Sequence, residues 1–124
     1  MRLLLDTHAF LWWDEGTLPA KVVRRIRAAD EVLVSAASAW EVAIKAGLGK
    51  IAVRGSFAEA VADYGFRELP VGFAHAELVR TLPLIHRDPF DRILVAQAIV
   101  EGLTIVTRDV LVTAYAVPSV WEQA

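Results

Sequence analysis

Four acidic residues stand out in this chain because each falls at the end of one expected element or near the start of the next. They are Asp6, Glu41, Asp91 and Asp109. Two carboxylates ~4 Å apart repel each other by about 4 kcal/mol at an effective dielectric constant near 20, so a group of them needs protons or a cation. The chain has no cysteine and no pair of histidines at helical spacing. If the fold gathers these acids, the chemistry they favour is therefore the binding of Mg²⁺ or Mn²⁺ rather than Zn²⁺.

Each acid taken alone also has an ordinary structural interpretation. Asp6 could accept a hydrogen bond from a nearby backbone N–H group, and Asp109 could begin an Asx-turn. Glu41 has Lys45 four residues later, in the favourable orientation for an ion pair on a helix. Asp91 could simply complement a helix dipole. Only the joint pattern of the four indicates a functional site.

The elements that would position these acids begin with an apolar run at the start of the chain. Leu3–Leu5 is apolar without alternation, which is typical of a strand buried on both faces of a parallel sheet, and Asp6 follows it directly. Further strands are expected over residues 32–35 and 103–107, the latter followed closely by Asp109. Because the carboxyl ends of parallel strands share one edge of a sheet, residues far apart in sequence are expected to converge there.

The clearest helix start in the chain lies late in the sequence. Asp88 is expected at the N-cap, Pro89 at the first helical position and Asp91 at the third, ahead of an apolar run over residues 93–100 that Gly102 ends. This pattern places Asp91 in the first turn of a long helix.

The remaining segments alternate between helical and extended patterns. We expect a short helical turn over residues 7–13, an amphipathic helix with a basic side over 20–29 capped by Thr17, and a helix over 37–46 capped by Ser35 or Ser38. After a linker over 50–54, we expect a capped helix from Ser56 to Gly65, a short strand over 66–71, a helix from 73 or 74 to 81, and an edge strand over 117–121. This alternation, joined by short connections, predicts an α/β fold with a mainly parallel sheet.

Composition narrows the possible functions. The chain has 124 residues, which fits one domain, and no apolar stretch of the ~20 residues that a membrane span needs. The segment before Asp6 is too short for a signal-peptide core, so we expect a soluble, cytoplasmic protein. The net charge of −2 argues that any contact with nucleic acid is local, while the hydrophobic share of 56% suggests an apolar interface with a partner.

Four stretches resemble the PIN-domain ribonucleases, in particular the VapC-type toxins of bacterial type II toxin–antitoxin systems. They follow the family's order and span nearly the whole chain: Leu3–His8, Ser38–Lys45, His86–Ala98 and Thr107–Asp109. The resemblance implies a three-layer α/β/α sandwich, with the whole chain forming a single PIN-like domain. It also implies an endoribonuclease that depends on Mg²⁺ or Mn²⁺.

Carried over to this sequence, the family's acidic set falls on Asp6, Glu41, Asp91 and Asp109, while Asp88 remains a helix cap. The implied chemistry is metal-assisted hydrolysis, in which the cation binds the scissile phosphate and orients a water for in-line attack. The number of ions is left open. Basic residues next to the acids in sequence could hold RNA phosphates, and two threonines could orient ligands: Lys45, Arg87, Arg92 and Arg108, with Thr7 and Thr107.

The resemblance further implies a homodimer and a cognate antitoxin whose segment packs in a groove near the acids. Trp12, Trp13 and the apolar positions of the helix over 20–29 are candidates for that groove, and an equally good interpretation places them in the core. The RNA substrate itself is not indicated by any motif.

Three other interpretations stay open. A phospho-receiver module also gathers acids at strand ends, but it needs a lysine after a later strand, where this chain has Arg108 and Asp109. A phosphatase with an aspartate nucleophile needs a second acid two residues after Asp6, but this chain has His8 there. A PIN-like domain that binds without turnover has the same fold and would differ only in its activity.

Overall fold

The computed structural model describes residues 1–51 and 55–123. Within these residues the strands form one sheet in the order β3-β2-β1-β4-β5, and all neighbouring strands are parallel. Their bounds are Arg2–Leu5 for β1, Glu31–Ser35 for β2, Arg67–Leu69 for β3, Thr104–Val106 for β4 and Ser119–Val120 for β5. The predicted parallel sheet is confirmed.

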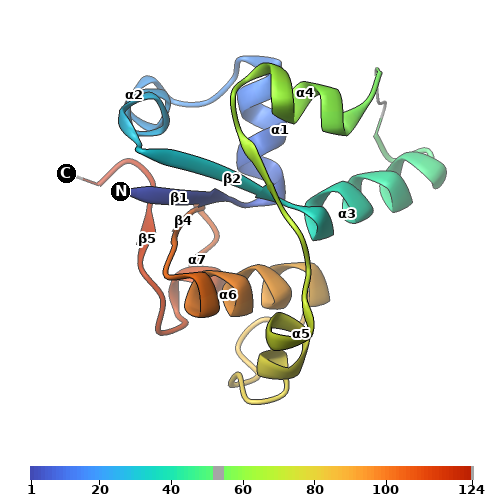
Figure 1. Ribbon diagram of the computed structural model, residues 1–124, viewed down its shortest axis with the longest axis vertical. Helices are drawn as coiled ribbons and strands as arrows, with labels where there is room; N and C mark the ends of the chain where they lie inside the picture. Colours follow the sequence, from blue (N-terminus) through green and yellow to red (C-terminus); the bar gives the residue numbers. More distant parts are fainter. Residues whose placement is uncertain (52–54, 124) are drawn as a thin grey trace.

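Helices cover both faces of this sheet. Figure 1 shows α1, α2 and α4 on one side and α5, α6 and α7 on the other, while α3 extends beyond the ends of the strands. The bounds are Thr7–Glu15 for α1, Ala20–Ala28 for α2, Ala36–Gly47 for α3, Phe57–Asp63 for α4, Phe73–Val79 for α5, Pro89–Glu101 for α6 and Val110–Thr113 for α7. The fold is the three-layer α/β/α sandwich that the resemblance implied.

Two separate cores hold the layers together, because successive side chains of a strand point to opposite faces. Leu3 and Leu5 of β1 pack with residues of α1, α2 and α4, whereas Leu4 packs with residues of α6 and α7. All three leucines are fully buried. The continuous apolar run at the start of the chain is therefore the middle strand of a sheet covered on both faces.

The order of the strands creates a switch point beside β1. The chain moves from β1 outward through β2 to β3, and then returns to the other side of β1 to form β4 and β5. In open α/β sheets, the crevice outside the carboxyl ends of the strands at such a point is where ligands bind. Asp6 follows β1 and Asp109 lies shortly after β4, so both lie at this point.

Local capping signals account for most of the helix starts. Ser35 accepts a hydrogen bond from the backbone of Ala37, Ser56 caps α4, and Asp88 caps α6 with Pro89 in its first turn. Gly102 ends α6 with a φ of 68°, a conformation that residues with a Cβ rarely adopt. The Asp88–Pro89 start predicted from sequence is confirmed.

One expectation about local structure was wrong, and one helix was not predicted. Thr17 does not cap α2, whose N-cap is Pro19; instead, its backbone and side chain both donate to the carbonyl of Trp12 at the end of α1. Helix α7 was not expected, because its single turn gives too little sequence for a helical period. The linker predicted over 50–54 lies partly outside the described residues. Within those residues, no helix has both the length and the apolar character to cross a membrane.

Candidate active site

A pocket opens at the switch point and gathers acidic side chains from several elements. Its volume is about 510 Å³. It lies between the end of β1, the start of α6 and the segment that joins β4 to α7. The lining residues are Asp6, His8, Trp12, His86, Asp88, Asp91, Arg108, Asp109 and Val110. Three of the four acids predicted from sequence therefore meet in one pocket.

Asp6 is held at the inner end of the pocket by its role as the N-cap of α1. Its Oδ1 accepts a hydrogen bond of 2.8 Å from the backbone N–H of Ala9, and the residue is only 6% exposed. Burial raises the pKa of this carboxyl, and the charge of Asp109 adds to that rise, whereas a hydrogen bond from Thr107 opposes it. The fold therefore keeps a buried acid against the sheet edge at a cost in electrostatic energy.

Asp91 lies one turn inside α6, beside the helix cap Asp88. Burial raises the pKa of Asp91 to about 7, and the charges of Asp88, Asp6 and Glu41 contribute to that rise. Asp88 itself accepts a hydrogen bond of 2.8 Å from the backbone N–H of Phe90, as expected for a cap. In the absence of a cation, the pocket therefore resists the ionisation of Asp91.

Each carboxylate oxygen of Asp109 has its own hydrogen-bond partner. Its Oδ1 accepts from the backbone of Leu111 at the start of α7, and its Oδ2 lies 2.9 Å from Nε2 of His86. Burial acts to raise its pKa, but the hydrogen bonds from His86 and Leu111 outweigh burial and the pKa is lowered. Asp109 and Asp91 thus have opposite pKa shifts although they lie in the same pocket.

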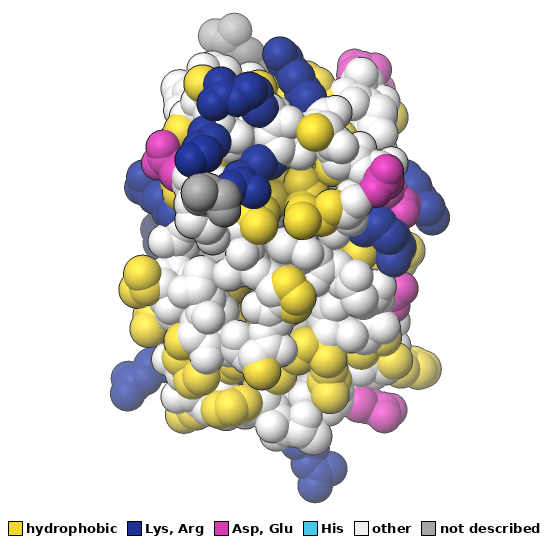
Figure 2. All heavy atoms as spheres, turned by 90° about the vertical axis from the view of Figure 1, so that its left-hand side faces the viewer, with side chains coloured by type: hydrophobic (Ala, Val, Ile, Leu, Met, Phe, Trp, Pro, Cys, Tyr) yellow, Lys and Arg dark blue, Asp and Glu magenta, His cyan; other side chains and the backbone are white. Residues whose placement is uncertain are grey.

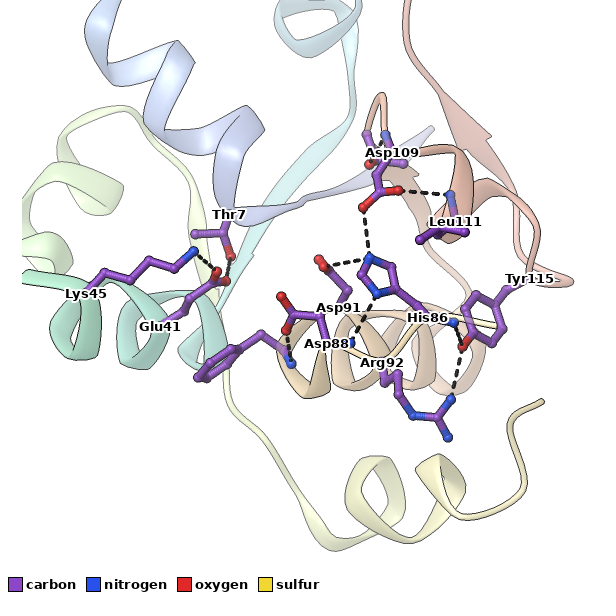
Figure 3. Close-up of polar contacts among 12 residues, drawn as sticks. Thr7, Glu41, Lys45, His86, Asp88, Asp91, Arg92, Asp109, Leu111 and Tyr115 are labelled. Atoms are coloured by element: carbon purple, nitrogen blue, oxygen red, sulfur yellow. Dashed lines mark hydrogen bonds and ion pairs between the residues drawn. The ribbon is translucent and has the colours of Figure 1, made fainter. Parts of the chain in front are cut away.

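His86 is the site residue that sequence reasoning missed. Its Nε2 lies 2.9 Å from Oδ2 of Asp109 and 3.1 Å from Oδ2 of Asp91, so the imidazole stands between the two carboxylates (Figure 3). These three residues each offer a ligand atom within 4.8 Å of the others. In the sequence, His86 begins the family-like stretch His86–Ala98 and lies two residues before the cap Asp88, and neither signal reveals a partner 23 residues later.

Glu41 lies beside the pocket rather than in its lining. This residue is 3% exposed, and its two oxygens accept from Thr7 Oγ1 at 2.7 Å and from Lys45 Nζ at 2.6 Å. Figure 3 shows this trio on α1 and α3, at a distance from the His86 cluster. Its link to the other acids is electrostatic, since the charge of Glu41 raises the pKa of Asp91.

The basic residues predicted to bind phosphate have very different surroundings. Arg108 lines the pocket and lies over the ring of Trp12, 4.3 Å from its centroid. The guanidinium of Arg92 is instead bonded to backbone carbonyls of the segment before α6 and to the hydroxyl of Tyr115. Arg87 is exposed and Lys45 is paired with Glu41. Of these four, Arg108 is the one placed to meet a ligand in the pocket.

Another group of basic side chains lies away from the acids. Figure 2 views the molecule from the side on which the strands begin, and Lys and Arg side chains gather there around α2. The exposed basic residues of this helix are Lys21, Arg24 and Arg27. The predicted basic side of this helix is therefore on the surface, on a different side of the molecule from the pocket.

The chemistry of the donor set fits a hard divalent cation. Asp6, Asp91 and Asp109 supply carboxylate oxygens from three different elements, and the raised pKa of Asp91 reflects a concentration of negative charge that a cation would relieve. Thr107 supports the arrangement from behind, because its Oγ1 accepts the backbone N–H of Asp109 at 3.0 Å and its side chain acts to lower the pKa of Asp6.

Comparison with known families and structures gives a consistent result. The family model described as PIN domain matches residues 3–116. Among solved structures, the chain is similar to VapBC2 from Rickettsia felis bound to a DNA fragment from its promoter, with 13% identity, a TM-score of 0.74, and coverage of 98% of this chain and 99% of that one.

Two further structures show the same fold. A toxin–antitoxin complex from Klebsiella pneumoniae has 18% identity and a TM-score of 0.69, with 98% of each chain covered. FitAcB from Neisseria gonorrhoeae has 19% identity and a TM-score of 0.65, covering 94% of this chain and 95% of that one. No curated protein sequence matches the chain.

Proposed function

The chain belongs to the PIN domain family, and from this membership we propose that it is a metal-dependent endoribonuclease acting as the toxin of a toxin–antitoxin pair. The observation that supports the enzymatic part most strongly is the meeting of Asp6, Asp91 and Asp109 in one pocket, where burial and neighbouring charges raise the pKa of Asp91 to about 7. A protein that binds no cation would gain nothing from this crowding, which costs electrostatic energy.

We propose that Asp6, Asp91 and Asp109 hold Mg²⁺ or Mn²⁺, with Glu41 contributing charge directly or through water. A bound divalent ion supplies charge neutralisation at a phosphodiester and activates water for hydrolysis. The chain's own residues provide the geometry: Asp6 and Asp109 are fixed by backbone donors at the starts of α1 and α7. Because these hydrogen bonds restrict the carboxylates before ligand arrives, little ordering remains to be done on binding.

We propose that RNA enters beside Arg108 and Trp12. The guanidinium is held over the indole ring and next to the acids, where it can pair with a phosphate adjacent to the reacting one. His8 is exposed in the same lining, 5.5 Å from Trp12 between ring centroids, and offers a surface on which a base can stack. Phosphate binding by Lys45, Arg87 and Arg92 remains a prediction with less geometric support.

We also propose that the protein binds a cognate antitoxin and forms a homodimer, and that it is a single-domain cytoplasmic protein. Support for a protein partner comes from an apolar groove of about 550 Å³ between α3, α5 and α6, in which Trp40 is 64% exposed. One of the structures with a similar fold is a toxin–antitoxin complex from Klebsiella pneumoniae. Trp12 and Trp13, the earlier candidates for a partner groove, are half-buried and pack against the core below α1.

The test is cleavage of single-stranded RNA by the purified chain freed of any partner, with Mg²⁺ or Mn²⁺ and with chelator. We expect cleavage with the ion, none with chelator, and a loss of more than about 100-fold in the variant Asp91→Asn. The matched control is Glu101→Gln, which changes an acid at the other end of α6 that also contacts a histidine. Absence of cleavage in every condition would contradict the nuclease proposal, and equal activity of Asp91→Asn would overturn the assignment of the site.

A further inference from the structure

His86 has hydrogen-bond partners on both sides of its ring, and this restricts what the ring can do. The backbone N–H of Asp88 donates to Nδ1 over 3.1 Å, while Nε2 faces Oδ2 of Asp109 at 2.9 Å and Oδ2 of Asp91 at 3.1 Å (Figure 3). The side chain is 13% exposed and is therefore largely buried. A backbone donor therefore faces one nitrogen of the ring, and two carboxylate oxygens face the other.

These contacts decide which nitrogen carries the hydrogen. A nitrogen that accepts a hydrogen bond must present its lone pair, and a neutral imidazole has one N–H group and one lone pair. Because Nδ1 accepts from Asp88, the hydrogen resides on Nε2, where it is donated to Oδ2 of Asp109, and Oδ2 of Asp91 lies 3.1 Å from the same nitrogen. The hydrogen bond accepted at Nδ1 and the carboxylates that face Nε2 therefore require the same tautomer.

From this we propose that His86 is a positioning residue and not a ligand of the metal: its Nε2–H holds the Oδ2 atoms of Asp91 and Asp109 together at the pocket. This inference rests on the proposed nuclease function. A metal ligand would need the lone pair on Nε2, which would move the hydrogen to Nδ1 and set it against the N–H of Asp88. The donor set is then made of oxygen alone, although the spacing of His86, Asp91 and Asp109 would also suit a mixed nitrogen–oxygen site.

The main chain of His86 is fixed as firmly as its ring. Its backbone N–H donates to the hydroxyl of Tyr115 over 2.9 Å, and the guanidinium of Arg92 donates to the same hydroxyl over 3.0 Å. Arg92 also bonds the carbonyls of Val79 and Pro83 in the segment that leads to His86. Arg92 therefore serves to hold the loop from which His86 reaches the acids.

The first test reads the tautomer directly and needs no RNA. In protein labelled with ¹⁵N in its three histidines, long-range proton–nitrogen correlation spectra identify which ring nitrogen carries hydrogen, with His86 assigned by loss of its signals in His86→Gln. We expect a protonated Nε2 on His86 both without metal and at saturating Mg²⁺. Loss of that hydrogen from Nε2 on adding Mg²⁺, or a hydrogen found on Nδ1, would overturn the inference. His75, whose Nδ1 accepts from Gly72, is the internal control and should not respond.

The second test separates donor from ligand with two variants. Gln places an amide N–H near the position of Nε2, whereas Asn places an acceptor near Nδ1 and no donor near the carboxylates. If His86 positions the acids, His86→Asn loses about 10–100-fold in Mn²⁺ affinity or in kcat, and His86→Gln recovers most of that loss. If His86 is a ligand, both variants lose Mn²⁺ affinity equally, because neither supplies an imidazole nitrogen.

The outcomes for His86 and for the nuclease proposal remain distinguishable. If the wild-type chain is inactive and Nε2 of His86 carries a hydrogen, the nuclease proposal fails and the hydrogen-bonding role of His86 stands. If the chain is active and Nε2 of His86 loses its hydrogen when the ion binds, the nuclease proposal stands and His86 is a metal ligand.

Discussion

Two histidines in this protein share the same local arrangement and differ in what surrounds it. His75 accepts at Nδ1 from the backbone of Gly72 at 3.0 Å, and its Nε2 lies 2.9 Å from Oε2 of Glu101. His86 accepts at Nδ1 from the backbone of Asp88, but its Nε2 meets two carboxylates instead of one. In both, a backbone N–H close in sequence selects the tautomer.

The difference lies in what the Nε2–H group meets. His75 is 7% exposed and joins α5 to the C-terminal end of α6, away from the acidic pocket, so its bond to Glu101 closes a packing contact. His86 lines the pocket, between two acids that arrive from α6 and from the segment before α7. In both histidines, a hydrogen bond from a backbone N–H close in sequence selects the tautomer of the ring. The carboxylates that face Nε2 come from distant residues, and they determine whether the ring contributes to packing or to the pocket.

The largest effect is expected at the acid that His86 does not touch. Asp6→Asn should lower RNA cleavage by more than about 100-fold, because an amide brings no negative charge to the cation. Asn can still accept from the backbone of Ala9, so α1 should remain capped and the protein folded. Initial rates with Mg²⁺ and circular dichroism check both points.

Asp6→Ala provides the comparison for the capping role. It should lose cleavage to the same degree and also about 1 kcal/mol of the free energy of unfolding, the usual cost of an N-cap. If Asp6→Asn cleaves at the wild-type rate, Asp6 is a cap and nothing more.

Substitutions at the two histidines should differ in their effects on stability and on RNA cleavage. His75→Ala should lower the free energy of unfolding by about 1–3 kcal/mol, because it leaves the N–H of Gly72 and the carboxylate of Glu101 without their partner. Cleavage per folded molecule should stay unchanged. His86→Gln should show the weaker effect on stability in urea denaturation, and a His75 variant that loses cleavage while folded would contradict the division.

The pH dependence of stability should distinguish the two acids that share His86. The pKa of Asp91 is raised to about 7 in the folded state from its ordinary value of 3.8, so the folded state holds that proton longer than the unfolded state does. This group therefore lowers the free energy of unfolding as pH rises from about 4 to about 7, by on the order of 1–3 kcal/mol after solvent screening. Asp109 has a lowered pKa and acts in the opposite sense: its stabilisation is present above the unfolded pKa and is lost on acidification.

The measurement is urea denaturation of metal-free protein across this range. Asp91→Asn should show a smaller decline toward neutral pH, because the raised pKa of Asp6 still contributes to it, and wild-type protein should regain the lost stability when Mg²⁺ is added at pH 8. The same decline in both proteins would show that Asp91 does not titrate as its surroundings indicate.

The smallest effect is expected at the rim of the pocket. Arg108→Ala should raise the KM for RNA by about 3–10-fold and leave kcat nearly unchanged, because one charged contact with a phosphate is lost. The dependence of KM on salt should become shallower. Arg24→Ala, on the exposed side of α2, is the matched control and should change neither; an equal effect of the two would indicate that only overall charge matters.

Much of the fold and part of the site follow from local signals in the sequence. The apolar run before Asp6 and the Asp88–Pro89 helix start were predicted at the places where the structure has them, because burial on both faces and capping depend on a few adjacent residues. The ion pair between Glu41 and Lys45 was likewise readable from their spacing of four. By contrast, α7 was missed, since one turn of helix has no period to detect.

The parts that were missed depend on long-range partners. The contacts of Arg92 could not be predicted, because its guanidinium is bonded to Tyr115, 23 residues later, and to carbonyls before α6. The role of His86 was not predicted either, since its carboxylate partner Asp109 is equally distant along the chain.

By itself, the sequence determined the alternation of strands and helices and placed acids at their ends, because apolar period and capping are set within a few residues. Only the tertiary structure decided that β4 lies beside β1, and therefore that Asp109 meets Asp6 and Asp91 in one pocket. The order of parallel strands depends on packing of the whole sheet between two helical layers, and no local pattern encodes it. The same packing brings His86 between its two carboxylates.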